Sequence, residues 1–422
     1  MEIQSLIEGI TTDIVYEYRG EQVLHYTIKL LGKKKIRHNL MNQQFAADLF
    51  YTFYLPYPRL RRNIPEPYIE QYSILQAMLR EPAIWKVKPL TVADKTISTI
   101  AASVFLERLI RELSMPRKSS RDRSSSEKEK LKEAVSRAMM DTSKIARNAS
   151  NIKQLLAKTG AGRASTLQFE NVLEEILELA RNTDIAKILE LLRSIEVSKI
   201  STRHTVRASR GWITSLEIGG DLERVHPSRL AFPEILFLVE LVNSRLLLYR
   251  KELPGSHGSI YVLLDKSGSM SGTKMDWARA VALALFIKSR GQGRNFYARF
   301  FDSIVYDRIN IPYTMYQRKA IDLIKYLGTV KAGGGTDIVK ALATASSDLL
   351  SSSVKGVSDV VLITDGEDKL SKHILKGIIS RGGFRLHTVM IQGDNPVLRE
   401  VSHSYMVAEK LDEKEVLRVV MF

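Results

Sequence analysis

Three loops in the C-terminal part of the chain carry oxygen-bearing side chains at regular positions. Asp265, Ser267 and Ser269 occupy alternate positions in the first loop. The second loop is a run of three glycines followed by Thr336, and the third places Asp365 directly before a glycine. Hydroxyls and carboxylates without histidine or cysteine suit a hard, octahedral cation such as Mg²⁺ or Mn²⁺. Together the five residues predict a divalent-metal site, although each loop taken singly is also typical of an ordinary polar turn.

The elements around these loops are expected to bring them to one edge of a sheet. Ile260–Leu264 and Asp359–Thr364 are short, mostly apolar runs, typical of strands buried on both faces of a parallel sheet. Trp277–Lys288 has the apolar spacing of a helix. Strands alternating with helices predict an α/β fold over residues 254–422, with a doubly wound, mostly parallel sheet that binds ligands at the carboxyl ends of its strands. Further strands are expected at Asn295–Phe301, Val305–Ile309 and Phe384–Gln392, and a further helix at Tyr316–Leu327.

The set D-x-S-x-S…T…D, from Asp265 to Asp365, resembles the metal-ion-dependent adhesion site of von Willebrand factor A (VWA) domains. The resemblance implies that Ser267, Ser269 and Thr336 are the main direct ligands of Mg²⁺. It implies that Asp265 and Asp365 act largely through water, and that an acidic residue of a partner protein binds at the metal. The C-terminal part of the chain is therefore expected to be a Rossmann-like VWA domain.

Residues 1–253 predict an irregular all-α N-terminal domain ahead of the sheet. Residues 14–31 are ambiguous, because their pattern fits a small hairpin about as well as a helix. Thr91–Leu113 is expected to be one long helix with Thr91 as its N-cap. Arg117–Lys130 has no apolar residue and predicts a mobile linker or, alternatively, a nucleic-acid-binding arm. Further helices are expected at Leu131–Arg147, Asn148–Lys158, Thr166–Arg181 and Asp184–Arg193.

Composition restricts the class of protein. The chain is 44% hydrophobic and 26% charged, which is typical of a soluble globular protein, and its 422 residues exceed one average core. A formal net charge of +16 favours contact with nucleic acid, an acidic protein or a membrane surface, but it also fits a solubilising surface bias. Because the chain has no cysteine, disulfides, thiolate zinc sites and cysteine nucleophiles are excluded.

The sequence indicates neither a signal peptide nor a membrane span. Met1–Gly20 carries acidic residues and has no basic start followed by an apolar core. Leu230–Tyr249 is the most apolar long stretch, but Glu234, Glu240 and Arg245 interrupt it. The protein is therefore expected to be cytoplasmic.

A second resemblance lies just ahead of the expected sheet. Ile218–Leu230, IGGDLERVHPSRL, resembles the G-D-D-L-x-x-V-x-P-S-x-L element that precedes the VWA domain in ViaA/CoxE-like proteins, and Leu241–Tyr249 also fits that family. The chain departs from the pattern at Gly220 and Arg229, where the family usually has acidic residues. The resemblance implies a MoxR-type AAA+ ATPase as partner, with this protein as its adaptor or cofactor in protein remodelling or metal-cofactor assembly. The same element also fits a purely structural clasp between the helices and the sheet.

No catalytic constellation accompanies the five oxygen-bearing residues. His257, His373 and His387 are the nearest candidate bases in sequence, and none has a defined spacing from those five residues. The chain also lacks the G-x-x-x-x-G-K-[ST] phosphate loop, so neither ATPase activity nor another enzymatic function is expected. The alternative function is RNA or nucleic-acid binding, because Ro-type RNA-binding proteins also combine helical repeats with a VWA domain and the positive charge suits phosphate contacts. A metal-dependent hydrolase is the third and least favoured function.

Overall fold

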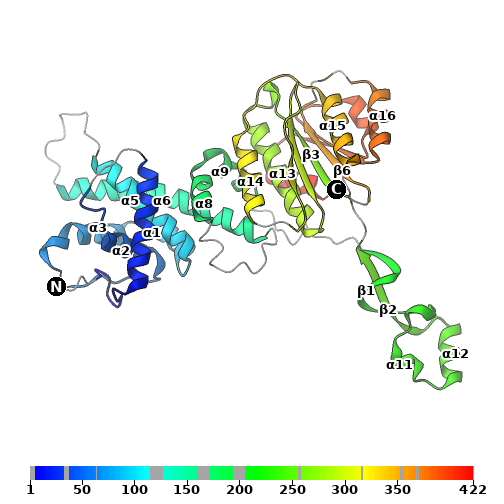
Figure 1. Ribbon diagram of the computed structural model, residues 1–422, viewed down its shortest axis with the longest axis horizontal. Helices are drawn as coiled ribbons and strands as arrows, with labels where there is room; N and C mark the ends of the chain where they lie inside the picture. Colours follow the sequence, from blue (N-terminus) through cyan, green and yellow to red (C-terminus); the bar gives the residue numbers. More distant parts are fainter. Residues whose placement is uncertain are drawn as a thin grey trace. The chain divides into compact units, whose positions relative to one another are not determined.

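The computed structural model describes residues 5–32, 38–62, 64–114, 127–158, 172–192, 205–254, 258–314, 317–351, 356–366, 368 and 370–421 (Figure 1). Its internal contacts divide the chain into two compact units. The first, here called the helical unit, comprises residues 1–193 together with 316–329. The second, here called the sheet unit, comprises residues 194–315 and 330–422.

A six-stranded sheet with the order β5-β4-β3-β6-β7-β8 forms the centre of the sheet unit. The pairs β3–β4, β3–β6, β6–β7 and β7–β8 are parallel, and the pair β4–β5 is antiparallel. This confirms the expected α/β class with a mostly parallel sheet. The strands are β3 (Ile260–Asp265), β4 (Phe296–Phe301), β5 (Ile309–Ile311), β6 (Asp359–Thr364), β7 (Arg385–Ile391) and β8 (Ser404–Ala408).

Helices pack on both faces of this sheet, because alternate side chains of a central strand point to opposite sides. Tyr261 and Leu263 of β3 share one core with Leu342 and Leu375. These two leucines belong to α15 (Ile338–Leu350) and α16 (Lys372–Gly382). On the other face, Trp277 of α13 donates a hydrogen bond to the carbonyl of Asp412 (3.2 Å), the N-cap of α18. In Figure 1 the helix α13 (Thr273–Gly291) lies beside β3. The C-terminal helices of the unit are α17 (Pro396–Val401) and α18 (Glu413–Val420).

The third strand of the sheet lies later in the chain than the sequence predicts. The expected strand Val305–Ile309 is wrong: β5 begins at Ile309, and Val305 forms an isolated bridge with Phe301. The cause is a tight turn after β4, in which the Asp302 carboxylate accepts a hydrogen bond from the Ile304 amide over 2.6 Å. This side-chain bond closes a turn next to the Phe301–Val305 bridge, and the regular strand starts only at Ile309.

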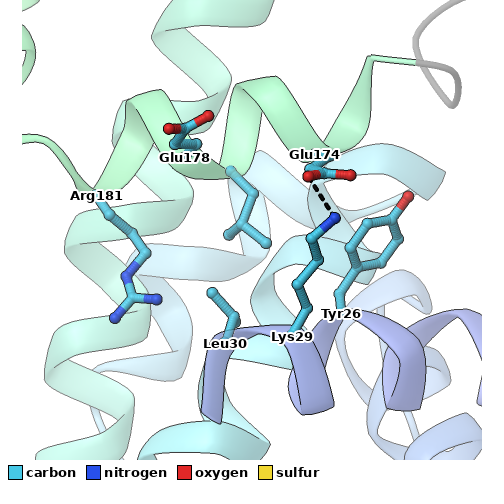
Figure 2. A pocket seen from close by; sticks show the side chains of 7 residues that line it. Tyr26, Lys29, Leu30, Glu174, Glu178 and Arg181 are labelled. Atoms are coloured by element: carbon cyan, nitrogen blue, oxygen red, sulfur yellow. Dashed lines mark ion pairs between the residues drawn. The ribbon is translucent and has the colours of Figure 1, made fainter. Parts of the chain in front are cut away.

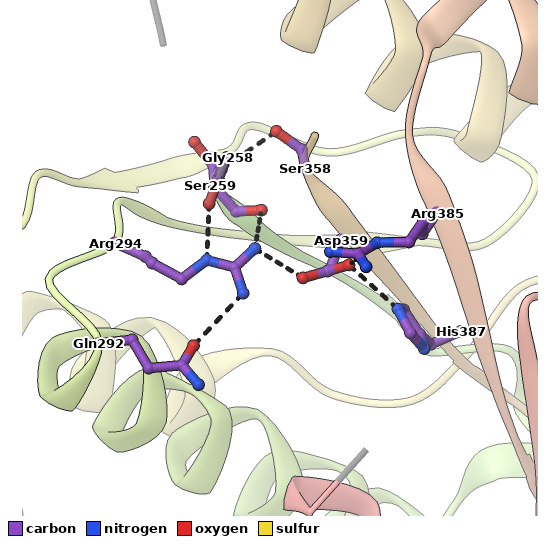
Figure 3. Close-up of polar contacts among 8 residues, drawn as sticks. All are labelled: Gly258, Ser259, Gln292, Arg294, Ser358, Asp359, Arg385 and His387. Atoms are coloured by element: carbon purple, nitrogen blue, oxygen red, sulfur yellow. Dashed lines mark hydrogen bonds and ion pairs between the residues drawn. The ribbon is translucent and has the colours of Figure 1, made fainter. Parts of the chain in front are cut away.

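A buried ion pair joins the amino ends of three strands, away from the polar loops (Figure 3). Arg294 donates to the Gly258 carbonyl over 2.6 Å and pairs with Asp359 over 2.6 Å. Nε2 of His387 lies 3.2 Å from the other oxygen of Asp359. Burial alone would raise the pKa of Asp359, but the hydrogen bond with His387 and the charge of Arg294 hold it well below its usual range. The cluster therefore fixes β3, β6 and β7 relative to each other.

An antiparallel hairpin precedes the sheet and is here called the arm, residues 205–254. Its strands are β1 (Thr205–Gly219) and β2 (Leu246–Pro254). Residues 205–253 were expected to belong to an all-α domain, but the arm is not all-α, because β1 and β2 pair with each other in a ladder. The connection between the strands holds η2 (Leu222–Arg224), α11 (Pro227–Leu230) and α12 (Glu234–Val242).

The helical unit is all-helical in its described residues, as the sequence predicts, except for one isolated bridge between Ile7 and Leu60. The ambiguous residues 14–31 form a single helix, because the Asp13 side chain accepts a hydrogen bond from the Tyr16 amide and caps the N-terminus. No helix in the described parts of the chain combines the length and apolar character needed to cross a bilayer. The unit contains α1 (Ile14–Leu31), α2 (Gln43–Tyr54), η1 (Glu66–Tyr68), α3 (Ile69–Arg80), α4 (Ile84–Thr91), α5 (Lys95–Ser114), α6 (Glu127–Lys158), α8 (Leu173–Arg181) and α9 (Thr183–Leu192).

Two helix boundaries differ from those expected. Thr91 is the last residue of α4 rather than an N-cap, and its hydroxyl donates to the Phe53 carbonyl over 2.9 Å. The following helix, α5, starts after Asp94, whose carboxylate accepts from the Ile97 amide. Residues 131–158, expected as two helices, belong to the single helix α6. Of the expected linker, residues 117–126 lie outside the described residues and 127–130 begin α6.

The helix α14 (Gln317–Thr329) belongs to the helical unit, although it lies between β5 and the glycine loop in sequence. It packs with α6, α8 and α9. Lys325 pairs with Glu178 of α8 over 3.7 Å. Gly328 lies so close to α9 that a Cβ there would approach Cγ1 of Ile185 to 2.7 Å. The chain thus leaves the sheet, contributes one helix to the helical unit, and returns.

The close approach at Gly328 predicts an unfavourable effect of a single methyl group. Gly328→Ala should lower the free energy of unfolding by about 1 kcal/mol, because crowding against Ile185 outweighs the gain in helix propensity. The matched control is Gly377→Ala in α16, where a Cβ would meet no atom within 4 Å and the change should stabilise. Thermal unfolding measures both, and equal stabilisation by the two variants would contradict the packing described here.

A buried carboxyl in the helical unit predicts a pH effect. Asp48 accepts hydrogen bonds from Ser5, from the Leu6 amide and from Tyr16. Burial nevertheless raises its pKa from 3.8 to about 6. The protonated form is favoured on folding, so this stabilisation is fully present below the unfolded pKa of 3.8 and is lost as pH rises through 6.

Asp48→Asn should remove this pH dependence. Between pH 4 and pH 7.5, wild-type protein should lose about 2 kcal/mol more unfolding free energy than the variant. Denaturant titrations at the two pH values measure the difference. Loss of the Leu6 hydrogen bond lowers the stability of the variant at both pH values, so the slope with pH is the readout. Identical slopes for the two proteins would show that Asp48 does not titrate in this range.

Candidate metal site

The first loop is ordered by the carboxylate that ends β3. Asp265 is fully buried, and its Oδ1 accepts a hydrogen bond from the Ser267 amide over 2.8 Å. The chain then turns through η3 (Gly268–Met270), which brings the hydroxyl oxygens of Ser267 and Ser269 within 3.1 Å of each other. The alternating pattern therefore directs the two serine hydroxyls to the same place.

The second strand end is joined to the first by Thr364, a residue that the sequence analysis did not select. Thr364 donates to Oδ2 of Asp265 over 2.5 Å. The contact follows from the register, which pairs Leu264 with Ile363 and makes the ends of β3 and β6 level. Asp365 comes next and is buried. The signal in the sequence is a polar residue that ends an apolar strand directly before the expected ligand.

Backbone hydrogen bonds attach the glycine loop to the first loop. The Gly333 amide donates to the Lys266 carbonyl over 2.7 Å, and the Gly268 amide donates to the Gly334 carbonyl over 3.0 Å. Gly334 has a φ of +96°, and a Cβ there would lie 2.6 Å from Oδ2 of Asp302. Glycine is therefore required at this position by both conformation and space. Thr336 follows the loop, half-buried, just before α15.

Two lysines border the three loops and are held by carboxylates. Lys266 pairs with Asp302 over 2.7 Å and lies 4.6 Å from the ring centroid of Tyr306. Lys274, at the start of α13, donates to Oδ2 of Asp365 over 3.1 Å. Neither lysine stood out in the sequence, because single lysines in polar loops carry no distinctive spacing. Their ion pairs offset part of the negative charge of the carboxylates around the loops.

The buried carboxylates provide a test of whether a cation fits. Burial raises the pKa of Asp265, an effect that its hydrogen bonds offset in part and the neighbouring charge of Asp365 reinforces. Oδ1 of Asp365 is buried and has no hydrogen-bond partner in the described part of the chain. Buried acceptors normally have a partner, so this oxygen is suited to a cation or to a metal-bound water.

The donor set fits a hard divalent ion. In the residues that the structure describes, no group of three or more His, Cys, Asp or Glu side chains is arranged to hold a metal. The loops instead combine hydroxyls with two carboxylates, the ligands typical of Mg²⁺. Ser267, Ser269 and Thr336 would hold the ion directly, and Asp265 and Asp365 would act through water. This assignment of roles stays a prediction.

Of the three histidines considered as bases, the two that the structure describes make no contact with these loops. His387 lies at the opposite end of the sheet, next to Asp359. His373 is exposed on α16, and His257 lies outside the described residues.

A separate hollow of about 440 Å³ lies in the helical unit (Figure 2). Lys29 of α1 and Glu174 of α8 form an ion pair at this hollow. Tyr26, Leu30, Leu177, Glu178 and Arg181 complete its lining. Because charges of both signs line it, the hollow favours no single class of ligand.

The fold and the loops define a von Willebrand factor A domain in the C-terminal part of the chain. Residues 260–367 match the family model described as von Willebrand factor type A domain. The match begins at β3 and includes all five residues of the candidate site.

Two similar proteins span most of the chain, and a third spans less than half of it. An uncharacterized protein of Methanocaldococcus jannaschii is 26% identical over 372 residues, covering 83% of this chain and 83% of its own length. A second uncharacterized protein of the same organism is 27% identical over 403 residues, covering 92% of this chain and 95% of its own length. A putative VWFA domain-containing protein of Acidianus two-tailed virus is 27% identical over 198 residues, covering 43% of this chain and 20% of its own.

Solved structures are similar over a smaller part. A von Willebrand factor type A protein from Catenulispora acidiphila has 20% identity and a TM-score of 0.33, covering 40% of this chain and 43% of that chain. Proximal thread matrix protein 1 of the mussel byssus, with zinc in its MIDAS motif, has 19% identity and a TM-score of 0.31, covering 39% of this chain and 46% of that chain.

The geometry predicts that one serine hydroxyl is needed for metal binding. Ser267→Ala should weaken binding of Mn²⁺ or Mg²⁺ at least tenfold, because it removes an oxygen next to Ser269 without disturbing the backbone bond to Asp265. The matched control is Ser271→Ala, an exposed serine beyond the loop, which should bind as wild type does. Isothermal titration calorimetry measures the affinities. Equal binding by wild type and Ser267→Ala would remove this serine from the site.

Proposed function

We propose that this protein is a non-catalytic, Mg²⁺-dependent protein-binding adaptor whose metal site accepts an acidic side chain of a partner. The observation that carries the proposal is the buried Oδ1 of Asp365, which has no hydrogen-bond partner in the described residues. Asp365 directly follows Thr364, the residue bonded to Asp265. Neutral hydroxyls leave a bound Mg²⁺ electron-poor, and Mg²⁺ keeps exchangeable positions when protein ligands are few. A carboxylate from another protein is therefore a favourable additional ligand.

The groups around the site favour binding over turnover. Catalysis at a metal needs a base placed against the attacking water or nucleophile. In the described residues, Lys266 and Lys274 next to the loops are already held in ion pairs with Asp302 and Asp365. No histidine contacts the loops in this part of the chain, so no imidazole base is placed against a metal-bound water there.

A MoxR-type AAA+ ATPase is the proposed partner, on the basis of the resemblance of the element Ile218–Leu230 to ViaA/CoxE-like proteins. Polar contacts between neighbouring residues stabilise this element. Asp221 caps η2 by accepting from the Glu223 amide over 3.0 Å and pairs with Arg224 over 2.7 Å. Arg229, one of the two departures from the family pattern, lies 3.5 Å from Glu240 of α12. The charge of Arg229 is therefore offset by Glu240 within the arm.

Affinity purification of the full chain from native lysate tests both parts of the proposal. Wild-type protein should recover an AAA+ ATPase in Mg²⁺ and lose it in EDTA. Ser267→Ala should lose it in both buffers, and Ser271→Ala should behave as wild type does. Recovery that is unaffected by EDTA would refute a metal-dependent contact.

Nucleic-acid binding is the alternative, and the net charge of +16 is the observation that favours it. Phosphate contacts release counterions, so RNA affinity should fall steeply with salt. Tight RNA binding with a steep log–log salt slope and no dependence on Mg²⁺ would favour this function over the adaptor.

A further inference from the structure

The helix α12 of the arm exposes an apolar stripe. Ile235, Leu238, Val239 and Val242 are spaced i, i+3, i+4 and i+7, which places them on one face of the helix. Their exposed fractions are 79%, 48%, 51% and 82%. Large side chains at this spacing normally face a core or another helix, and these four face solvent instead.

The opposite face of α12 is already used within the arm. Phe237 and Leu241 are half-buried, and the helix packs on β2. Apart from Glu234 and Glu240, every residue of α12 is apolar. A helix that is apolar on all sides is normally covered on all sides. We therefore expect the exposed stripe to pack against a second surface, in addition to β2.

The stripe is complementary to itself. Leu238 and Val239 lie at its centre, and Ile235 and Val242 lie equally far from that centre on either side. A two-fold axis through the centre places Leu238 against Val239 of an antiparallel second copy, and Ile235 against Val242 of that copy. The stripe alone falls short of the ~800 Å² per partner of a standard interface, so association should depend on concentration. Further exposed apolar side chains of the arm can widen the contact, namely Leu216, Ile218, Leu222, Leu230 and Leu236.

The charges at the two ends of α12 agree with this arrangement. Glu234 is exposed at the N-terminus, and Arg245 is exposed just beyond the C-terminus. Within the described part of the chain, neither side chain makes an ion pair or a hydrogen bond. An antiparallel second copy brings Glu234 of each chain toward Arg245 of the other, whereas a parallel copy would bring like charges together. We propose that α12 is the interface through which two copies of this chain associate, antiparallel and two-fold symmetric.

Engineered cysteines test the proposal directly, because the native chain contains no cysteine. In the proposed pair, the two copies of residue 239 are offset by only about 1.5 Å along the helix axis, and those of residue 235 by about 10.5 Å. A disulfide tolerates a Cα separation of up to about 7 Å. Mild oxidation should therefore link Val239→Cys into a covalent dimer and leave Ile235→Cys unlinked. The double variant Ile235→Cys with Val242→Cys should link again, because residue 235 of one copy faces residue 242 of the other.

Equal linking of Val239→Cys and Ile235→Cys would overturn the antiparallel arrangement. Analytical ultracentrifugation of the full chain without engineered cysteines provides the second test. Wild type should dimerise with rising concentration, and Ile235→Glu with Val242→Glu should stay monomeric, while Ile374→Glu, an exposed apolar position on α16, should dimerise as wild type does. Glu234→Arg and Arg245→Glu should each weaken the dimer roughly tenfold, and the two together should restore it. A monomeric wild type would overturn the proposal.

All these measurements are made in EDTA as well as in Mg²⁺. Dimerisation through an apolar stripe should be the same in both buffers, because all five candidate metal ligands lie outside the arm. Failure of the dimer is thus distinguishable from failure of the metal site.

Discussion

One hydrogen bond between two strand ends sets the geometry of the candidate site. Thr364 donates to Oδ2 of Asp265, while the Ser267 amide donates to Oδ1 of the same carboxylate. An ionised carboxylate in a buried position is unfavourable unless its oxygens are bonded. Both oxygens of Asp265 are therefore occupied in joining β6 to the first loop. The buried pairing of β3 with β6 provides the rigid base that such a site needs.

The glycine loop connects this rigid base to a different part of the molecule. It is attached to the first loop through Gly333 and Gly334, and a few residues earlier the chain leaves α14, which packs within the helical unit. The loop is therefore covalently linked both to the sheet and to a helix with partners outside it. The arm adds a surface of opposite character, in which the apolar face of α12 contrasts with the polar loops. A metal-dependent contact and an apolar contact draw on different forces and respond to different conditions.

The sequence by itself determined the class of fold and the composition of the site. The buried strands β3 and β6 were predictable, because a continuous apolar run between polar turns has few alternatives. The mostly parallel sheet and the helical N-terminal part followed from patterns that extend over whole elements. The residues Asp265, Ser267, Ser269, Thr336 and Asp365 could be selected because each lies in a loop next to a predicted strand or helix and because all five offer oxygen ligands. Their role as metal ligands remains a prediction.

Only the tertiary structure decided which distant segments meet. The partnership of Thr364 with Asp265 depends on strand register, and that of Lys274 with Asp365 depends on how α13 packs on the sheet. The same limit explains why periodicity predicted a helix at residues 316–327 but could not assign it to the helical unit. The spacing of apolar residues predicts that one face of a helix packs against another surface. It does not identify that surface, as α12 illustrates. Local pattern specifies elements, whereas long-range pairing specifies neighbours, because neighbours are selected by packing between residues far apart in the chain.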